Sequence, residues 1–353
     1  MKRVFLSGIY LFLAVGMIAQ TAVVNVRESE SMKGAVVASY FLPQTVLVVE
    51  VEAIKTIRKA GPYAADARQY LGAPAKIRQD EESWVINTVN VTQRSEPDVR
   101  NQYLVYASNN SNAALLTLTG TGILKGINLP FSLGEKEDRH LNTTQESEEK
   151  AAGSSFISNY YVQEVDSSES SASVIFEQIN SLREARLNIL LQYNDVLQHG
   201  SAVEAYLREI DKRERELKAL FNGMERKEVV RRTFIVYPDR EMNGQEIFRF
   251  SEERGFSDTG SPVTITLKRR SPARDRPAAS TGKNNKKAKI GFVYRMPALM
   301  EVEVAGWDRT ALWTGQIGVA QLGRLVSLPV GLFDKNNRAE FDTTTGGLLQ
   351  IGR

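Results

Sequence analysis

Residues 173–222 read SVIFEQINSLREARLNILLQYNDVLQHGSAVEAYLREIDKRERELKALFN, and their apolar positions recur at intervals of three and four. This spacing places the apolar side chains on one face of a helix. The run His199-Gly200-Ser201 interrupts the pattern, because Gly200 can end one helix and Ser201 with Glu204 forms a capping box for the next. No proline lies in either half. The segment therefore predicts two helices folded back on each other as a long antiparallel hairpin.

The first of these helices is apolar on more than one side of its C-terminal half. Leu187, Leu191 and Val196 widen its apolar surface beyond the stripe that one antiparallel helix can cover. Two interpretations follow, because large apolar patches are uncommon on the surface of a monomer. The favoured one is that this half lies on the rest of the protein. The other is a docking face for a second protein, with these three residues as the candidate partner-docking residues.

The sequence on both sides of the hairpin predicts short β-strands separated by turns. Residues 46–49 are continuously apolar, which is typical of a strand buried on both faces, whereas residues 263–267 alternate as in a half-buried strand. A short helix is expected over Tyr63–Leu71. Further strands are expected at residues 84–91, 103–107, 115–119, 233–237, 247–250, 291–295, 300–304, 316–328 and 341–351. The fold class is therefore α+β, a mostly antiparallel β-rich body with a long helical hairpin in the middle of the chain.

The start of the chain has the pattern of a secretory signal peptide. Lys2 and Arg3 precede an apolar core at residues 4–18, and cleavage is expected between Ala19 and Ala22. No later stretch is apolar for long enough to cross a membrane. The chain has no cysteine, which excludes disulfides and the lipid-modified cysteine of a bacterial lipoprotein. We expect an exported protein in the periplasm or associated with the outer membrane, without a membrane span once the signal is removed.

Differences in composition divide the chain into segments. After a signal peptide at residues 1–20, an N-terminal β-rich part covers 21–133. Residues 134–171 hold nine carboxylates against three basic residues, which favours an acidic mobile linker. The hairpin occupies 172–224, and a C-terminal β-rich part covers 225–353. A basic loop at 268–289, with nine basic residues and one acid, interrupts this last part.

No catalytic, cofactor-binding or metal-ligating residue is predicted. The two histidines, His140 and His199, have no serine–acid constellation or metal-ligand spacing around them. A formal charge of +3 gives no reason to expect nucleic-acid binding. Paired carboxylates could make an exported glycan hydrolase, and the pairs Glu50/Glu52 and Glu301/Glu303 are the candidates. Because each pair alternates with apolar residues, we favour the solvent side of a strand for both.

The chain resembles a family in several strand and turn segments. They are residues 40–52, Gly61-Pro62-Tyr63-Ala64, Tyr70-Leu71-Gly72, residues 291–297, Gln321-Leu322-Gly323, Leu328-Pro329 and residues 341–352. These segments resemble an uncharacterised exported family of Gram-negative anaerobes, a domain of unknown function. The resemblance implies an envelope location and a link to outer-membrane export machinery. It carries over no catalytic residue.

Two functions from different classes follow. The favoured hypothesis is a non-catalytic envelope protein that binds or scaffolds other periplasmic or outer-membrane proteins, as an accessory of outer-membrane secretion machinery. Its expected partners are other envelope proteins, with self-association left open, and no cofactor is expected. The alternative is the exported glycan hydrolase. A cleft with two facing carboxylates would favour the hydrolase.

Overall fold

The structure is a computed structural model that describes residues 22–31, 35–107, 115–130, 168–192, 200–270, 291–333 and 337–353. The elements, in chain order, are β1 (Ala22–Asn25), η1 (Val26–Ser31), β2 (Ala35–Lys59), α1 (Ala67–Leu71), β3 (Glu81–Ala107), β4 (Leu116–Leu118), β5 (Leu124–Ile127), α2 (Ser168–Gln192), α3 (Gly200–Asn222), β6 (Met224–Val236), β7 (Met242–Ser251), β8 (Gly255–Phe256), β9 (Ser261–Arg269), β10 (Phe292–Ala305), β11 (Ala311–Leu328), η3 (Val330–Leu332), β12 (Arg338–Phe341) and β13 (Leu348–Gly352).

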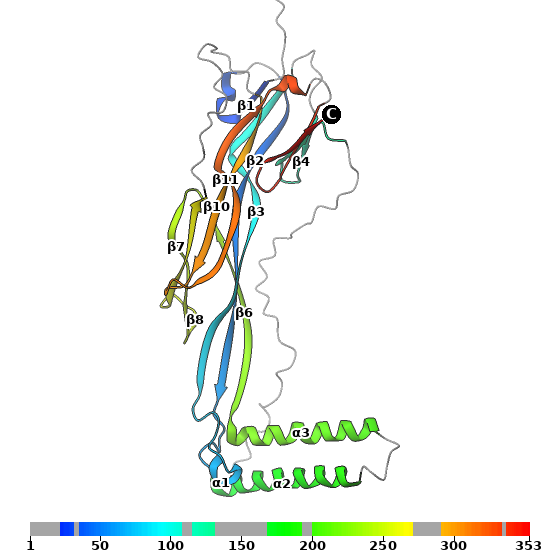
Figure 1. Cartoon of the computed structure of the whole chain (residues 1–353), viewed down its shortest axis with the longest axis vertical. Helices are drawn as coiled ribbons and strands as arrows, with labels where there is room; N and C mark the ends of the chain where they lie inside the picture. The colour runs from blue at the N-terminus through cyan, green and yellow to red at the C-terminus, as the bar shows by residue number, and fades with distance from the viewer. Residues whose placement is uncertain are drawn as a thin grey trace, which may run out of the picture.

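One ribbon of two long strands runs along the molecule (Figure 1). Strand β2 has 25 residues and β3 has 27, and they pair antiparallel from Ala35 opposite Ala107 to Arg58 opposite Glu81. The sequence predicted two short strands where β3 is continuous. Its polar middle contains Pro97 and Asp98 and resembles a turn, but a register shift between Phe41 and Leu42 accommodates residues 99–101 within the ladder.

Three antiparallel sheets build the β body. Their strand orders are β1-β3-β2-β6, β11-β10-β9-β7-β8 and β13-β12-β5-β4. Strand β6 follows the helices in sequence and pairs with β2, which precedes them. Strands from both sides of the helical segment therefore form one body, and the prediction of an antiparallel β-rich α+β fold is confirmed.

Two apolar cores fill this body. The first lies between the middle of the β2–β3 ribbon and the five-stranded sheet, and it contains Leu47, Val49, Val51, Val263, Ile265, Leu267, Met300, Val302 and Val304. The second lies at the end of the ribbon where β5 and β12 pack, and it contains Tyr40, Leu42, Tyr103, Ile127, Phe292 and Phe341. Val46 and Leu47 are adjacent and both fully buried, so the strand predicted to be buried on both faces is confirmed.

The helices α2 and α3 lie side by side at the opposite end of the ribbon from the second core (Figure 1). Arg183 pairs with Glu214 and Arg186 with Asp211, so the residue number rises along one helix as it falls along the other. The two helices therefore run antiparallel. Their connection, residues 193–199 with His199 and Val196, lies outside the described residues.

Several predicted segments fall wholly or partly outside the described residues. They are the signal peptide, most of the acidic linker with His140, and residues 271–289 of the basic loop. Helix α2 begins at Ser168, within the segment predicted as linker, and β9 extends to Arg269, within the predicted basic loop. The short helix α1 begins at Ala67 after a series of turns and ends at Gly72, whose φ of 77° is left-handed. No helix in the described ranges is both long and apolar enough for a membrane crossing.

Candidate functional site

Helices α2 and α3 form what we call the helical arm, and its base is closely packed. Phe221 and Ile179 are fully buried there in a third apolar core. The rings of Tyr63 and Tyr70 lie 5.6 and 5.9 Å from the ring of Phe221. These contacts between large aromatic side chains hold the base of the arm against residues 63–71.

The last carbonyl groups of α3 are satisfied by the segment that follows β2. The backbone N–H of Tyr63 donates to Leu220 O at 3.0 Å, and that of Ile77 donates to Asn222 O at 3.0 Å. Gly61 lies so close to this helix end that a Cβ atom there would approach Leu220 O to 2.1 Å. The arm is therefore joined to the ribbon by backbone contacts as well as by side chains.

Ion pairs hold the register of the two helices farther along the arm. Glu214 accepts from Arg183 Nε at 2.9 Å and pairs with Lys218 Nζ at 2.7 Å, while Arg186 pairs with Asp211 at 3.2 Å. The bond from Lys218, together with that from Arg183, lowers the pKa of Glu214 although partial burial opposes the shift. Glu214 therefore stays ionised at neutral pH and links the helices.

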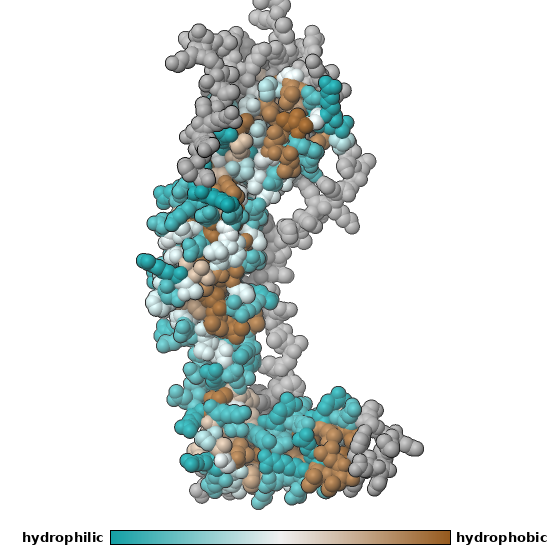
Figure 2. Space-filling model, in the orientation of Figure 1, coloured by the Kyte–Doolittle hydropathy of each residue, from teal (hydrophilic) through white to brown (hydrophobic). Residues whose placement is uncertain are grey.

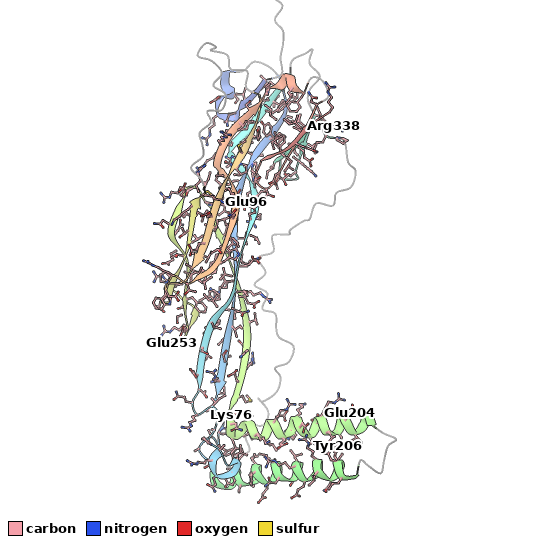
Figure 3. The ribbon with its side chains drawn as sticks, viewed as in Figure 1. Lys76, Glu96, Glu204, Tyr206, Glu253 and Arg338 are labelled. Atoms are coloured by element: carbon pink, nitrogen blue, oxygen red, sulfur yellow. The ribbon has the colours of Figure 1, made fainter. Side chains whose placement is uncertain are left out.

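Apolar side chains are exposed near the far end of the arm. Leu187, Leu190, Leu191 and Tyr206 have between 48% and 66% of their surface exposed, and we call them the arm-tip surface. The pairing of Arg186 with Asp211 sets the antiparallel register, which brings Leu191 level with Tyr206. Figure 2 shows apolar residues gathered over this end, and Figure 3 labels Tyr206 there.

For the described residues, up to Gln192, the favoured prediction that this half of the first helix lies on the β body is wrong. Leu187 and Leu191 are each more than half exposed, because the arm meets the rest of the protein at its base and then projects away from it (Figure 1). Two of the three candidate docking residues are thus at the surface, while Val196 lies outside the described residues. Tyr206 was missed in the sequence, because a single tyrosine on a charged helix gives no local signal.

The candidate carboxylate pairs lie on the solvent side of their strands, as expected. Glu50, Glu301 and Glu303 are exposed. Glu52 accepts hydrogen bonds from Asn87 Nδ2 at 2.7 Å and Arg231 Nε at 3.0 Å. The bond from Asn87, followed by that from Arg231, lowers the pKa of the Glu52 carboxyl. A general acid in glycoside hydrolysis needs the opposite shift.

One hollow has two carboxylates in its wall. It lies where the ribbon meets the arm, has a volume of about 510 Å³, and is lined by residues that include Arg58, Lys76, Arg78, Glu81 and Glu225. Arg58 donates to Glu225 at 2.9 Å and to Glu81 at 3.3 Å. The bond from Arg58 lowers the pKa of Glu225. Both carboxylates are thus held by the same guanidinium group, and Glu225 is held in its ionised form.

Lowered carboxyl pKa values are found across the described part of the chain. Each described carboxyl group whose pKa is displaced has it lowered: Glu52, Asp80, Asp98, Glu214, Glu225 and Asp308. No group of three or more histidine or carboxylate side chains among the described residues is placed to hold a metal ion.

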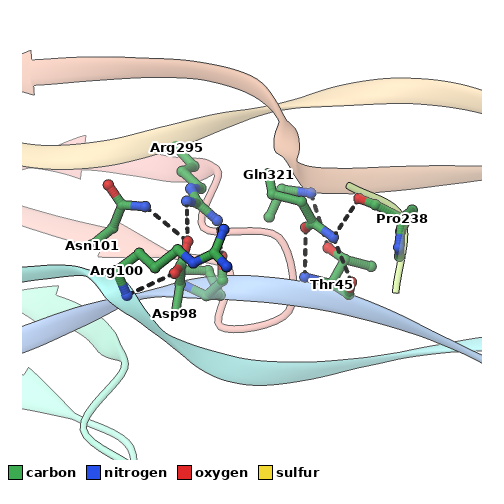
Figure 4. A network of polar contacts seen from close by, with 9 residues as sticks. Thr45, Asp98, Arg100, Asn101, Pro238, Arg295 and Gln321 are labelled. Atoms are coloured by element: carbon green, nitrogen blue, oxygen red, sulfur yellow. Dashed lines mark hydrogen bonds and ion pairs between the residues drawn. The ribbon is translucent and has the colours of Figure 1, made fainter. Parts of the chain in front are cut away.

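A buried polar network joins the β2–β3 ribbon to strand β10 (Figure 4). Asp98 on β3 accepts hydrogen bonds from Arg295 on β10 and from Asn101, and Arg295 also donates to Pro43 O at 2.6 Å. The side chains of Arg295 and Asp98 are only 6% and 9% exposed. Burial raises the pKa of Asp98, but the hydrogen bonds from Asn101 and Arg295 outweigh burial and lower it.

A second set of bonds lies nearby. Thr45 N donates to Gln321 Oε1 at 2.8 Å, and Gln321 Nε2 donates to Thr45 O and Pro238 O. Both sets lie where β3 and β10–β11 depart from regular register. Every side chain in them is engaged with the protein itself, so the network positions strands.

Comparison with curated proteins found no match, and comparison with solved structures likewise found none. A family profile does match, over residues 36–349, a range that holds all of the β2–β3 ribbon except Ala35, the arm and most of the second core. The predicted resemblance to a domain of unknown function is confirmed, and the chain belongs to the family described as Domain of unknown function (DUF4831).

Proposed function

We propose that this is a non-catalytic envelope protein that binds or scaffolds other periplasmic or outer-membrane proteins, as an accessory of outer-membrane secretion machinery. In this proposal α2 and α3 act as one continuous hairpin that carries the docking surface. The observation that carries the proposal is the exposed arm-tip surface on a firmly attached arm. An exposed apolar patch of this kind is typical of a protein–protein contact.

The chemistry of the arm favours a helical partner with an apolar stripe. Leu187, Leu190 and Leu191 follow the spacing with which a helix presents anchors to another helix. Helix α3 carries five acidic and five basic residues, so it has no excess of either charge. A polyanion or a strongly acidic protein would find little electrostatic attraction on this surface.

Support for a non-catalytic role comes from the carboxyl groups. The glycan hydrolase needs a carboxyl whose pKa is raised. Both candidate pairs lie on solvent faces of strands, and Glu81 and Glu225 in the hollow are bound to Arg58. An envelope location rests on the expected signal peptide and on what the family resemblance implies.

The test uses the full chain, tagged and expressed in its own cells, with Leu187→Gln and Leu191→Gln combined. The melting temperature of the purified variant should stay unchanged, because both side chains are already more than half exposed. One or more envelope proteins that co-purify with the wild type should be lost. Val229→Gln is the matched control, since Val229 is 55% exposed on β6, far from the arm tip.

Two outcomes would oppose the proposal. An unchanged melting temperature with an unchanged set of co-purifying proteins would remove the arm-tip surface from the function. Loss of the same proteins in the Val229→Gln control would show that binding depends on the ribbon and not on the arm.

A further inference from the structure

The terminal strands of the sheets differ in how their free edges are protected against pairing with another chain. Strand β13 is the terminal strand of its sheet and pairs with β12 alone among the described strands. An edge strand presents a row of N–H and C=O groups that can pair with another chain. Residues Leu348–Gly352 contain no charge and no proline, and Leu349 and Ile351 are 62% and 45% exposed.

Strand β6, also a terminal strand, has the opposite character. It carries Glu225, Arg226, Lys227, Glu228, Arg231 and Arg232. Charged side chains on an edge oppose pairing with a further strand, and natural sheets use them for this purpose. Strand β6 is therefore protected against such pairing, whereas β13 is not; the shorter terminal strands β1, β4 and β8 also lack charged residues.

The turn before β13 holds the strand in place. Asp342 accepts from the backbone N–H of Thr344 at 2.8 Å and from Thr345 Oγ1 at 2.6 Å. Gly346 has a φ of 76°, and a Cβ atom there would approach Pro43 Cγ to 2.8 Å, so the turn packs against β2. Because the strand is already formed, pairing costs little ordering entropy.

We propose that β13 pairs antiparallel with β13 of a second copy, about a two-fold axis at Gln350. In this register Leu349, which the β12–β13 ladder leaves unpaired at a register shift, faces Ile351 of the second copy on both sides of the axis, so apolar meets apolar. Gln350 faces Gln350 of the second copy. Its side-chain amide donates to Glu340 at 2.8 Å and can also form a hydrogen bond across the axis. A contact of this kind uses the same surface twice and closes at two copies.

The pairing adds to the proposed function without depending on it. The C-terminal end of the chain lies at the other end of the molecule from the arm (Figure 1). A dimer joined at β13 would leave both arm-tip surfaces free and would present two of them at once. Two linked docking surfaces bind a partner that has two sites more tightly than one does.

The chain has no cysteine, which permits a direct test on the full-length protein. Gln350→Cys places the thiols of the two copies opposite each other, with Cβ atoms about 4.5–5.5 Å apart, close to the range of a disulfide. Mild oxidation should give a cross-linked dimer rapidly. Val229→Cys and Leu187→Cys are matched controls, since both residues are 55% exposed, and they should cross-link slowly.

Sedimentation of the cysteine-free protein gives the second readout. The wild type should be a dimer, and Leu349→Lys combined with Ile351→Lys should weaken dimerisation about tenfold or more, because lysines then face each other across the axis. The melting temperature of the variant at low concentration checks that it still folds. A wild type that stays monomeric at every concentration, with Gln350→Cys no faster than its controls, overturns the proposal.

Two other results also overturn it. Faster cross-linking of Leu187→Cys would show that the arms pair instead. An open series of oligomers would show that β13 pairs with a different edge, such as β4, in a contact that does not close.

Discussion

Two parts of the β2–β3 ribbon have the same backbone pairing but different surroundings. In the middle of the ribbon, Leu47, Val49, Val89 and Val91 are buried against the five-stranded sheet. The part next to the arm, which we call the stalk, consists of residues 54–59 and 81–86 with residues 224–230 of β6, and ion pairs connect its neighbouring strands. They are Lys55–Glu82 at 3.1 Å, Arg58–Glu81 at 3.3 Å and Arg58–Glu225 at 2.9 Å.

The comparison shows that two strands can continue beyond their apolar core. Exposed ion pairs contribute little each, so the stalk depends on its backbone ladder and on the cores at its two ends. Apolar burial against the five-stranded sheet stabilises the middle of the ribbon, and the third core lies at the other end of the stalk, at the arm base. The protein thus holds its arm at a distance from the body without a core along the whole length.

The largest effect is expected where the body contains a buried charge pair. Asp98→Asn leaves the Arg295 guanidinium buried without its carboxylate, which should lower the free energy of unfolding by about 3–5 kcal/mol. Denaturant unfolding of the purified protein measures this loss. Glu96→Gln is the control, because the Arg94–Glu96 pair is exposed and its loss should change the stability little.

The same variant should differ from the wild type in its response to acid. The pKa of Asp98 is lower in the folded protein than in the unfolded chain, where it is about 3.9. Its contribution is therefore present above about pH 4 and is lost as the pH falls toward the folded pKa. The stability gap between wild type and Asp98→Asn should narrow below about pH 4, and a gap that stays constant there would contradict the assignment.

A smaller and more local effect is expected at the base of the arm. Ile179→Ala removes a fully buried side chain from the third core, which should cost roughly 2–5 kcal/mol of local stability. Hydrogen exchange should become faster in α2 and α3 and stay unchanged in β10 and β11. Equal acceleration in both regions would mean that the arm and the body unfold as one unit.

The smallest effect is expected in the stalk. Arg58→Ala removes the ion pairs to Glu81 and Glu225, yet all three side chains are well exposed. The melting temperature should move by no more than about 2 °C, and the difference should shrink further at high salt. A large loss of stability would show that the ion pairs, and not the backbone ladder, hold the stalk together.

Local patterns in the sequence determined many of the elements. The alternation of Val263, Ile265 and Leu267 places them on the buried face of β9, and Met300, Val302 and Val304 do the same on β10. The intervals of three and four along residues 173–222 correspond to α2 and α3. These features could be predicted because the periods of strands and helices repeat within a few residues.

Only the tertiary structure decided which of these surfaces are covered and how far the strands extend. The charge-rich segment 224–232 is part of β6 because β2 lies beside it. Its own sequence does not resemble a buried strand. Asp98 and Arg295 are 197 residues apart, so neither gives a local sign of its partner. The exposure of Leu187 and Leu191 follows from where the arm leaves the ribbon. An apolar residue has the same local pattern whether the protein covers it or leaves it free, because burial depends on elements far away in the sequence.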